Sequence, residues 1–501
     1  VEELDAAAVQ SAAQKYLVRN NRTVGLFIPS ETADRVTIPD STDFIARLEG
    51  YKGREVVQAG ENFDPSPANI EDRTLRGEMA PGLQFALLPK STRGETVSML
   101  LTLRFGTPET LVDRRAAAEL LGTVMSRGTE SMDYQTLQDE LTRLRAEMSV
   151  STTPGLLQVT VKTKRENVSE VLELVGDVLR HPELSQKEFD AVKLQLITGL
   201  QQRLSDPTAL AVRAVQRATS PYGSDDIRYV QTLEEEIEMY ESVELGELRS
   251  LHEELLSGQR GELAAVGAFD PDSLKSEVLG MLAGWKSDTE YVRVDRPANV
   301  RAEGELSEIN VPDKANAFFF STMQMELPDT APEFAPLVLG NFIFGGGSLS
   351  SRLGNRVRQQ EGLSYTVRSS LGPRPKDGRS DFVVYAITNP ENKDKLMAVI
   401  REEFEKLRED GVTEEELEKA KTAYLQGERV RRTNDGALAG ELVQSLFLDR
   451  TMKFDQEFED RIQSATVESV NQAIRSYLSW EAMEKAVAGD FEKAAETGES
   501  P

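Results

Sequence analysis

Arg358 and Tyr365 are the side chains in this sequence whose types and spacing could do chemistry together. The arginine lies near the end of a predicted helix, a break follows at Glu361-Gly362, and the tyrosine lies in a predicted strand over residues 363–367. Their separation of seven residues across this corner lets both side chains reach one surface. A guanidinium and a phenol on one surface can hydrogen-bond a peptide carbonyl and stabilise an oxyanion. The alternative is that Arg358 caps its own helix and Tyr365 packs on a sheet face.

Metal ligands are scarce in this sequence. It has no cysteine, and its only histidines are His181 and His252. The segment that starts at His252 opens like a His-Glu-x-x-His zinc helix, but Leu256 stands where the second histidine would be. His181 precedes a proline in a polar turn, far from any second ligand. We therefore expect no metal on this chain and interpret both histidines as ordinary surface or helix-flank residues.

The overall charge is strongly negative. The 501 residues include 85 Asp and Glu against 58 Lys and Arg, which gives a formal charge of −27. This charge argues against nucleic acid or an anionic membrane as a partner and leaves cationic peptides or simple solubility as its use. The sequence contains no run long enough to span a membrane. Its length and its 39% hydrophobic content predict two to four packed domains.

The elements that would position these side chains recur along the chain. A helix followed by a strand occurs three times, at about residues 9–28, 248–269 and 470–491. A longer pattern of strand, turn and helix occurs over residues 159–179 and again over residues 383–407, and its turn residues Glu166 and Glu391 are 225 positions apart. We interpret the longer pattern as the duplication of one folded body.

Each body contains strands interrupted by helices. This pattern predicts an α+β fold of two homologous domains, each a mostly antiparallel sheet with helices packed on one face. The first helix-strand unit has no body in front of it, so we interpret it as the tail of a preceding domain. The expected organisation is a tail at 1–29, a linker at 30–66, a first domain at 67–286, a connection at 287–304 and a second domain at 305–501.

The stretch around Arg358 and Tyr365 resembles the second-half signature of the pitrilysin/insulinase family of zinc peptidases. A Gly-Gly-Gly turn after Phe344, a helix bearing Arg358, then Glu361-Gly362 and Tyr365 follow one another in the family's order. In that family an arginine and a tyrosine from this part assist a zinc site that lies in the other half. The resemblance therefore implies a catalytic role for Arg358 and Tyr365 at a metal that this chain does not hold.

The family's metal motif is replaced in the first domain. The family has His-x-x-Glu-His shortly before a Gly-Thr pair, whereas here Glu119-Leu-Leu-Gly-Thr123 precedes Gly128-Thr129. Both histidines and the glutamate base are missing, and the helix over 189–199 offers no glutamate as a third ligand. A zinc hydrolase needs its ligands and a base that activates water, so the resemblance implies a catalytically silent domain.

By this resemblance the chain is the non-catalytic, C-terminal half of a clamshell zinc metalloendopeptidase. Zinc is expected on a catalytic half, in the same polypeptide or in a separate subunit, and the two halves would enclose an extended or unfolded peptide. The resemblance favours the bacterial periplasm or envelope as the compartment. The alternative is a non-enzymatic structural or peptide-binding subunit, because silent members of the family also serve as structural core subunits. An unrelated α+β enzyme would need a catalytic constellation that we do not find in the sequence.

Overall fold

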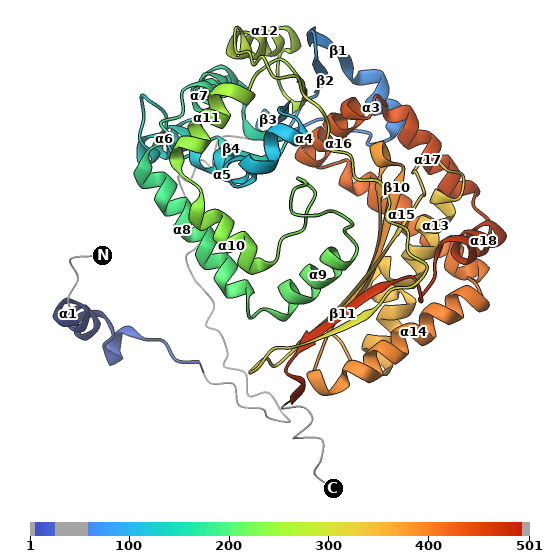
Figure 1. Cartoon of the computed structure of the whole chain (residues 1–501). Helices are drawn as coiled ribbons and strands as arrows, with labels where there is room; N and C mark the ends of the chain where they lie inside the picture. The colour runs from blue at the N-terminus through green and yellow to red at the C-terminus, as the bar shows by residue number, and fades with distance from the viewer. Residues whose placement is uncertain (1–5, 26–58, 493–501) are drawn as a thin grey trace, which may run out of the picture. The chain divides into compact units, whose positions relative to one another are not determined.

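The computed structural model describes residues 6–25 and 59–492 (Figure 1). It divides into a small unit, Val1–Val56, and a large unit, Val57–Pro501. No helix among the described residues is long and apolar enough to cross a membrane.

The small unit contains one helix, α1 (Ala6–Tyr16), and a 3-10 turn at Arg19–Asn21. The strand predicted after this helix is not seen at residues 22–25, which have no regular secondary structure, and its remainder lies outside the described residues. The predicted linker also lies outside them up to residue 58.

The first body of the large unit holds a six-stranded sheet with the order β1-β2-β6-β3-β5-β4. Its strands are β1 (Leu75–Ala80), β2 (Leu83–Pro89), β3 (Thr96–Arg104), β4 (Glu147–Thr153), β5 (Leu156–Lys164) and β6 (Gly261–Gly267). β2 and β6 run parallel, and the other neighbours run antiparallel. Its helices are α3 (Pro67–Arg73), α4 (Pro108–Leu111), α5 (Arg115–Met125), α6 (Tyr134–Arg143), α7 (Val168–Arg180), α8 (Gln186–Arg203), α9 (Pro207–Ala218), α10 (Leu233–Ser242), α11 (Leu245–Leu255) and α12 (Pro271–Leu282).

The second body holds a five-stranded sheet with the order β7-β11-β8-β10-β9. Its strands are β7 (Leu306–Asn310), β8 (Ala317–Met325), β9 (Thr366–Arg374), β10 (Arg379–Thr388) and β11 (Glu484–Gly489). Here β7 and β11 are the parallel pair. Its helices are α13 (Phe334–Asn341), α14 (Lys393–Glu409), α15 (Glu414–Arg431), α16 (Asp435–Phe447), α17 (Met452–Ser464) and α18 (Val467–Tyr477), with π-helical turns η4 (Phe342–Gly346) and η6 (Gly354–Gln360).

The predicted α+β class is confirmed, and each sheet is mixed because it contains one parallel pair. The repeated pattern of strand, turn and helix corresponds to β5 with α7 and to β10 with α14. The apolar residues of α7 recur at helical spacing, and its Val171, Val175 and Val178 are almost completely buried. This amphipathic face packs the helix against its own sheet.

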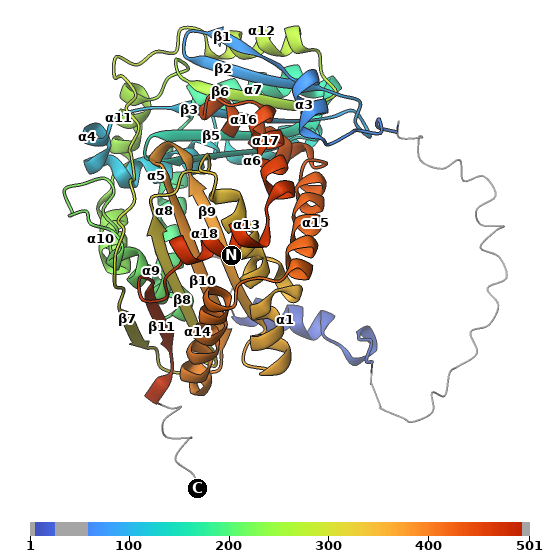
Figure 2. The same ribbon diagram turned by 90° about the vertical axis from the view of Figure 1, so that its right-hand side faces the viewer.

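Each sheet also carries, on its second face, a helix from the other body. α16 packs on β2, β3 and β6, and α9 packs on β7, β8 and β11. Figure 2 shows α16 lying across β3 and β6, although it is far from them in the sequence. The two shared cores contain Leu88, Val266, Leu438 and Leu442 on one side, and Ala211, Val215, Phe318 and Ala486 on the other. The two bodies are therefore joined by buried apolar side chains from both.

Candidate functional site

Arg358 and Tyr365 both lie on the surface, and neither has a partner among the described residues. Arg358 belongs to η6, and Tyr365, which is 88% exposed, immediately precedes β9. By contrast, Arg352 and Arg356 of the same segment form ion pairs with glutamates. Among the described residues the side chain of Arg358 does not cap its helix, and that of Tyr365 does not pack on a sheet face. Both side chains are free to meet a ligand.

A close glycine contact with β9 sets the path of the chain before Arg358. Gly345 in η4 lies so near Ser369 of β9 that a Cβ would be 2.6 Å from its backbone nitrogen. Further along, Leu353 and Val357 are fully buried. Because these two residues anchor one side of the segment, the next residue, Arg358, lies on its exposed side.

The strand that follows Arg358 begins later than the sequence predicted. The strand begins at Thr366, whereas we expected it to begin at Leu363. The reason is that the N–H of Leu363 donates to the carbonyl of Val357 at 3.0 Å, which continues the helical turn. This bond closes the helical turn around Gly362, whose φ of +62° suits glycine.

Glu119, the residue at the first position of the replaced metal motif, is engaged in other bonds. It lies on α5, accepts from Arg115 at 3.1 Å and accepts a hydrogen bond from the phenol of Tyr240. Burial and the neighbouring Glu119 raise the pKa of Tyr240, so this phenol stays a donor. The Glu119 carboxylate is thus held by protein groups.

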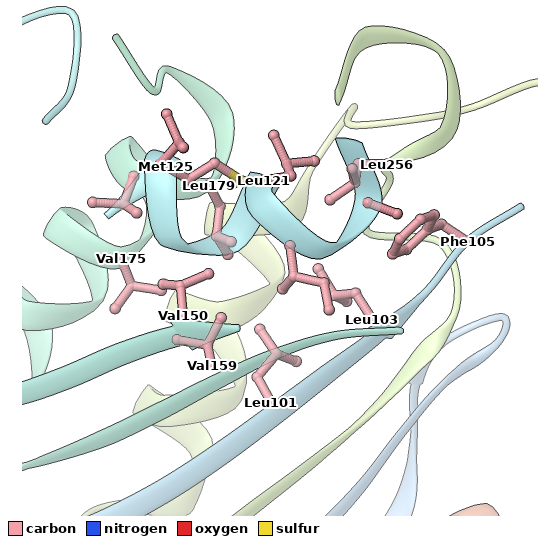
Figure 3. Close-up of a cluster of buried hydrophobic side chains, with 14 of the residues drawn as sticks. Leu101, Leu103, Phe105, Leu121, Met125, Val150, Val159, Val175, Leu179 and Leu256 are labelled. Carbon is pink, nitrogen blue, oxygen red and sulfur yellow. The ribbon is translucent and has the colours of Figure 1, made fainter. Parts of the chain in front are cut away.

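Gly122, the residue at the position of the family's glutamate base, packs against the backbone of β4. Its N–H donates to the hydroxyl of Thr152 at 2.7 Å. A Cβ at Gly122 would lie 2.8 Å from backbone atoms of Ser151 and Thr152. Figure 3 shows Leu121 and Met125 of α5 in one cluster of buried side chains with Val150 of β4 and other sheet residues. α5 is therefore packed too closely on the sheet for a glutamate side chain at position 122.

Both histidines have structural surroundings. His252 on α11 makes a 2.8 Å hydrogen bond through Nε2 with the carbonyl of Leu179, and its ring lies 6.0 Å from that of Trp285. Burial lowers the pKa of His252, so the neutral ring is favoured. His181 is exposed at the end of α7. No group of three His, Cys, Asp or Glu residues that could hold a metal occurs in the described ranges, and the residues at the motif do not fit zinc.

A pocket of about 670 Å³ lies beside β9, and sequence patterns could not predict it because its walls come from distant segments. It includes the β9 residues Arg368 and Ser370 and a set of aromatic side chains from α13, η4, α15 and α17: Phe334, Phe342, Tyr424, Phe454 and Phe458. Arg432, also on the pocket wall, is only 2% exposed and binds Glu441 at 3.1 Å. Burial and the neighbouring Glu441 raise the pKa of Asp455 in this pocket to about 7.

Comparison with known proteins assigns both bodies to one family. Residues 86–221 match the insulinase (peptidase family M16) domain, and residues 242–424 match the peptidase M16 inactive domain. The chain belongs to the peptidase M16 (insulinase/pitrilysin) family. The family resemblance inferred from the sequence is confirmed.

Three relatives extend this comparison. A non-peptidase homolog, YmxG of Helicobacter pylori, is 20% identical over 381 residues, which cover 75% of this chain and 85% of that protein. The crystal structure of a peptidase M16 inactive domain from Pseudomonas fluorescens has a TM-score of 0.71 at 19% identity and covers 83% of this chain and 97% of that one. The periplasmic protease PqqL of Escherichia coli has a TM-score of 0.67 at 15% identity, and its match spans 97% of this chain and 50% of PqqL.

Proposed function

We propose that this chain is a non-catalytic M16 protein that binds extended peptides without hydrolysing them. The contact of Gly122 with Thr152 is the observation that carries this proposal, because it fills the place where a peptidase needs its general base. The similarity to a non-peptidase homolog and to an inactive-domain structure supports the same conclusion. This favours the structural or peptide-binding alternative over the reading as half of a peptidase.

The candidate peptide site is the outer edge of β9. β10 is the only strand that pairs with β9 in the described sheet, so the other edge of β9 can accept an added strand. The neighbouring aromatic side chains can take up apolar side chains of such a peptide. Main-chain pairing supplies affinity for peptides of many sequences, and the aromatic pocket beside β9 supplies a preference for peptides with apolar side chains.

Binding of labelled peptides, followed by fluorescence anisotropy, tests this proposal. A peptide with N-methyl groups on alternate amides loses one row of donors, so it should bind about tenfold more weakly or worse than its unmethylated parent. Phe454→Ala should weaken binding to a similar extent, about tenfold, because it removes an aromatic wall of the pocket. Leu194→Ala, which removes an exposed leucine of α8, is the matched control.

Two results would count against the proposal. One is equal affinity for the parent and the N-methylated peptides. The other is hydrolysis of any of these peptides by the purified chain in the presence of zinc.

A second candidate function rests on the free side chains of Arg358 and Tyr365. Here the chain assembles with a zinc-bearing catalytic half, and these two residues contact the peptide carbonyl during hydrolysis. An envelope or periplasmic location would suit this role, and the periplasmic relative PqqL supports it. In such an assembly Tyr365→Phe should lower turnover roughly tenfold or more at unchanged zinc content. Tyr16→Phe, at another exposed tyrosine, is its control, and unchanged turnover in Tyr365→Phe would remove this candidate.

A further inference from the structure

Six arginines line one pocket of about 360 Å³ at the meeting point of the two bodies. They come from α5, α9, β9, β10 and the connecting segments: Arg115, Arg213, Arg228, Arg296, Arg374 and Arg379. The acidic side chains on the same walls are Glu119 and Glu236. The chain as a whole has a formal charge of −27, so this gathering of positive charge runs against its composition.

Five of these arginines have acidic partners. The ion pairs are Arg115–Glu119, Arg213–Glu236, Arg228–Asp226, Arg228–Asp295, Arg374–Asp381 and Arg379–Asp381, so six arginines face five carboxylates. Arg374 and Arg379 therefore share one carboxylate, at 3.0 and 2.8 Å. This one carboxylate only partly compensates the positive charges of Arg374 and Arg379.

The side chain of Arg296 has no hydrogen-bond or ion-pair partner in the described part of the chain. Burial lowers the pKa of Arg296, and the positive charges of Arg374 and Arg115 lower it further. The hydroxyl of Ser220, on the wall of the same pocket, is buried without a hydrogen-bond partner. A partly buried cation beside other cations is stabilised when an anion binds next to it.

The charges on the walls favour a carboxylate as this anion. A guanidinium binds either a carboxylate or a phosphate with two parallel hydrogen bonds. Arg296 supplies one unpaired positive charge, whereas Glu119 and Glu236 on the same walls repel additional negative charge. A singly charged carboxylate therefore fits this balance better than a doubly charged phosphate. The volume lies within the range of sites for small ligands.

We propose that this arginine pocket binds a carboxylate group and thereby selects peptides that carry a free C-terminus or an acidic side chain. The inference deepens the proposed function, because it names the class of peptide that the chain prefers. The pocket also contains Glu119, so the surface at the replaced metal motif would recognise charge instead of holding a metal.

Anisotropy with three versions of one labelled peptide tests the inference: a neutral C-terminal amide, the free acid, and an amide with one Gln changed to Glu. The wild type should bind at least one carboxylate-bearing version about tenfold more tightly than the neutral amide. The version that gains affinity identifies the source of the carboxylate. Arg296→Gln should abolish this preference while its affinity for the neutral amide stays unchanged. Arg93→Gln removes an exposed arginine in the loop between β2 and β3 and should retain the preference.

Thermal unfolding with small anions provides a readout that does not depend on peptide binding. N-acetylglycine, which carries a single carboxylate, should raise the Tm of the wild type and of Arg93→Gln more than that of Arg296→Gln at equal ionic strength. Equal affinity of the wild type for all three peptides would overturn the inference and leave the peptide-binding function in place. Loss of all peptide binding would count against the proposed function, and the Tm shift with N-acetylglycine would then test the pocket by itself. Stabilisation by inorganic phosphate but not by N-acetylglycine would overturn the assignment to carboxylates.

Discussion

The backbone N–H of Gly122 on α5 donates to the side-chain hydroxyl of Thr152 on β4, at 2.7 Å. The second body has a corresponding contact, in which Gly345 lies against Ser369 of β9. In both bodies a helical segment therefore approaches the edge strand of its sheet at a glycine. The first body, with Gly122 where the family motif has a glutamate, shares this close packing with the second.

Gly122→Ala should destabilise the protein because the added methyl would lie 2.8 Å from the backbone of β4. We expect a loss of roughly 1–3 kcal/mol in the free energy of unfolding, measured by urea denaturation. Gly199→Ala is the matched control, since a Cβ at this exposed helical position meets no atom within 4 Å. It should stabilise the protein by about 0.5–1 kcal/mol. If Gly122→Ala had the same free energy of unfolding as the wild type, α5 would be able to shift away from β4.

Restoring the motif should not restore a zinc site. The triple variant Glu119→His, Gly122→Glu, Thr123→His supplies the side chains of the family's motif, but the helix over 189–199 still offers no glutamate as a third ligand. The glutamate at position 122 also cannot fit beside Thr152 without displacing α5. We expect the purified variant to be less stable and to contain much less than one zinc per chain, measured by elemental analysis. The double variant Glu119→His, Thr123→His separates loss of packing at Gly122 from loss of ligands. Stoichiometric zinc in a folded triple variant would contradict this explanation of the silent domain.

Arg432 should be among the most sensitive charged residues of the second body. Its side chain is 2% exposed and binds Glu441 and Glu459. Arg432→Ala leaves these carboxylates without their buried cation, so we expect a loss of about 3–5 kcal/mol in the free energy of unfolding. Arg429→Ala, at an exposed arginine of the same helical region, should change it by less than about 0.5 kcal/mol. Similar denaturation midpoints for the two variants would contradict this view of the network.

Asp455 should make stability fall as the pH rises. In the folded protein the pKa of Asp455 is raised to about 7, whereas an unfolded aspartate has a pKa of about 3.9. Between these values the folded state keeps a proton that the unfolded state releases, so the free energy of unfolding decreases from about pH 4 to about pH 7.

Asp455→Asn keeps this side chain neutral and should remove that decrease. At about pH 8 we expect the variant to exceed the wild type by roughly 1–2 kcal/mol, and at about pH 4 the two should be nearly equal. Asp460→Asn on the same helix is the control, because Asp460 is exposed. Parallel stability curves for wild type and Asp455→Asn would show that another group titrates.

The sequence predicted the elements whose signals are local. The strand-turn-helix patterns of β5 with α7 and of β10 with α14 depend on neighbouring residues, and these elements lie where they were expected. It could not predict the environments of Arg296 and Asp455, because both depend on segments far apart in the chain. The same is true of Gly122, whose sequence context shows a missing glutamate but not the strand that takes up the space.

The reciprocal packing of α9 and α16 makes the two bodies depend on each other. α9 follows α8 in the first body, α16 follows α15 in the second, and each completes the core of the other body. Two identical subunits related by a twofold axis would exchange their helices in this way. Here both helices belong to one chain, so the exchange is intramolecular, and neither body has a complete core without the other.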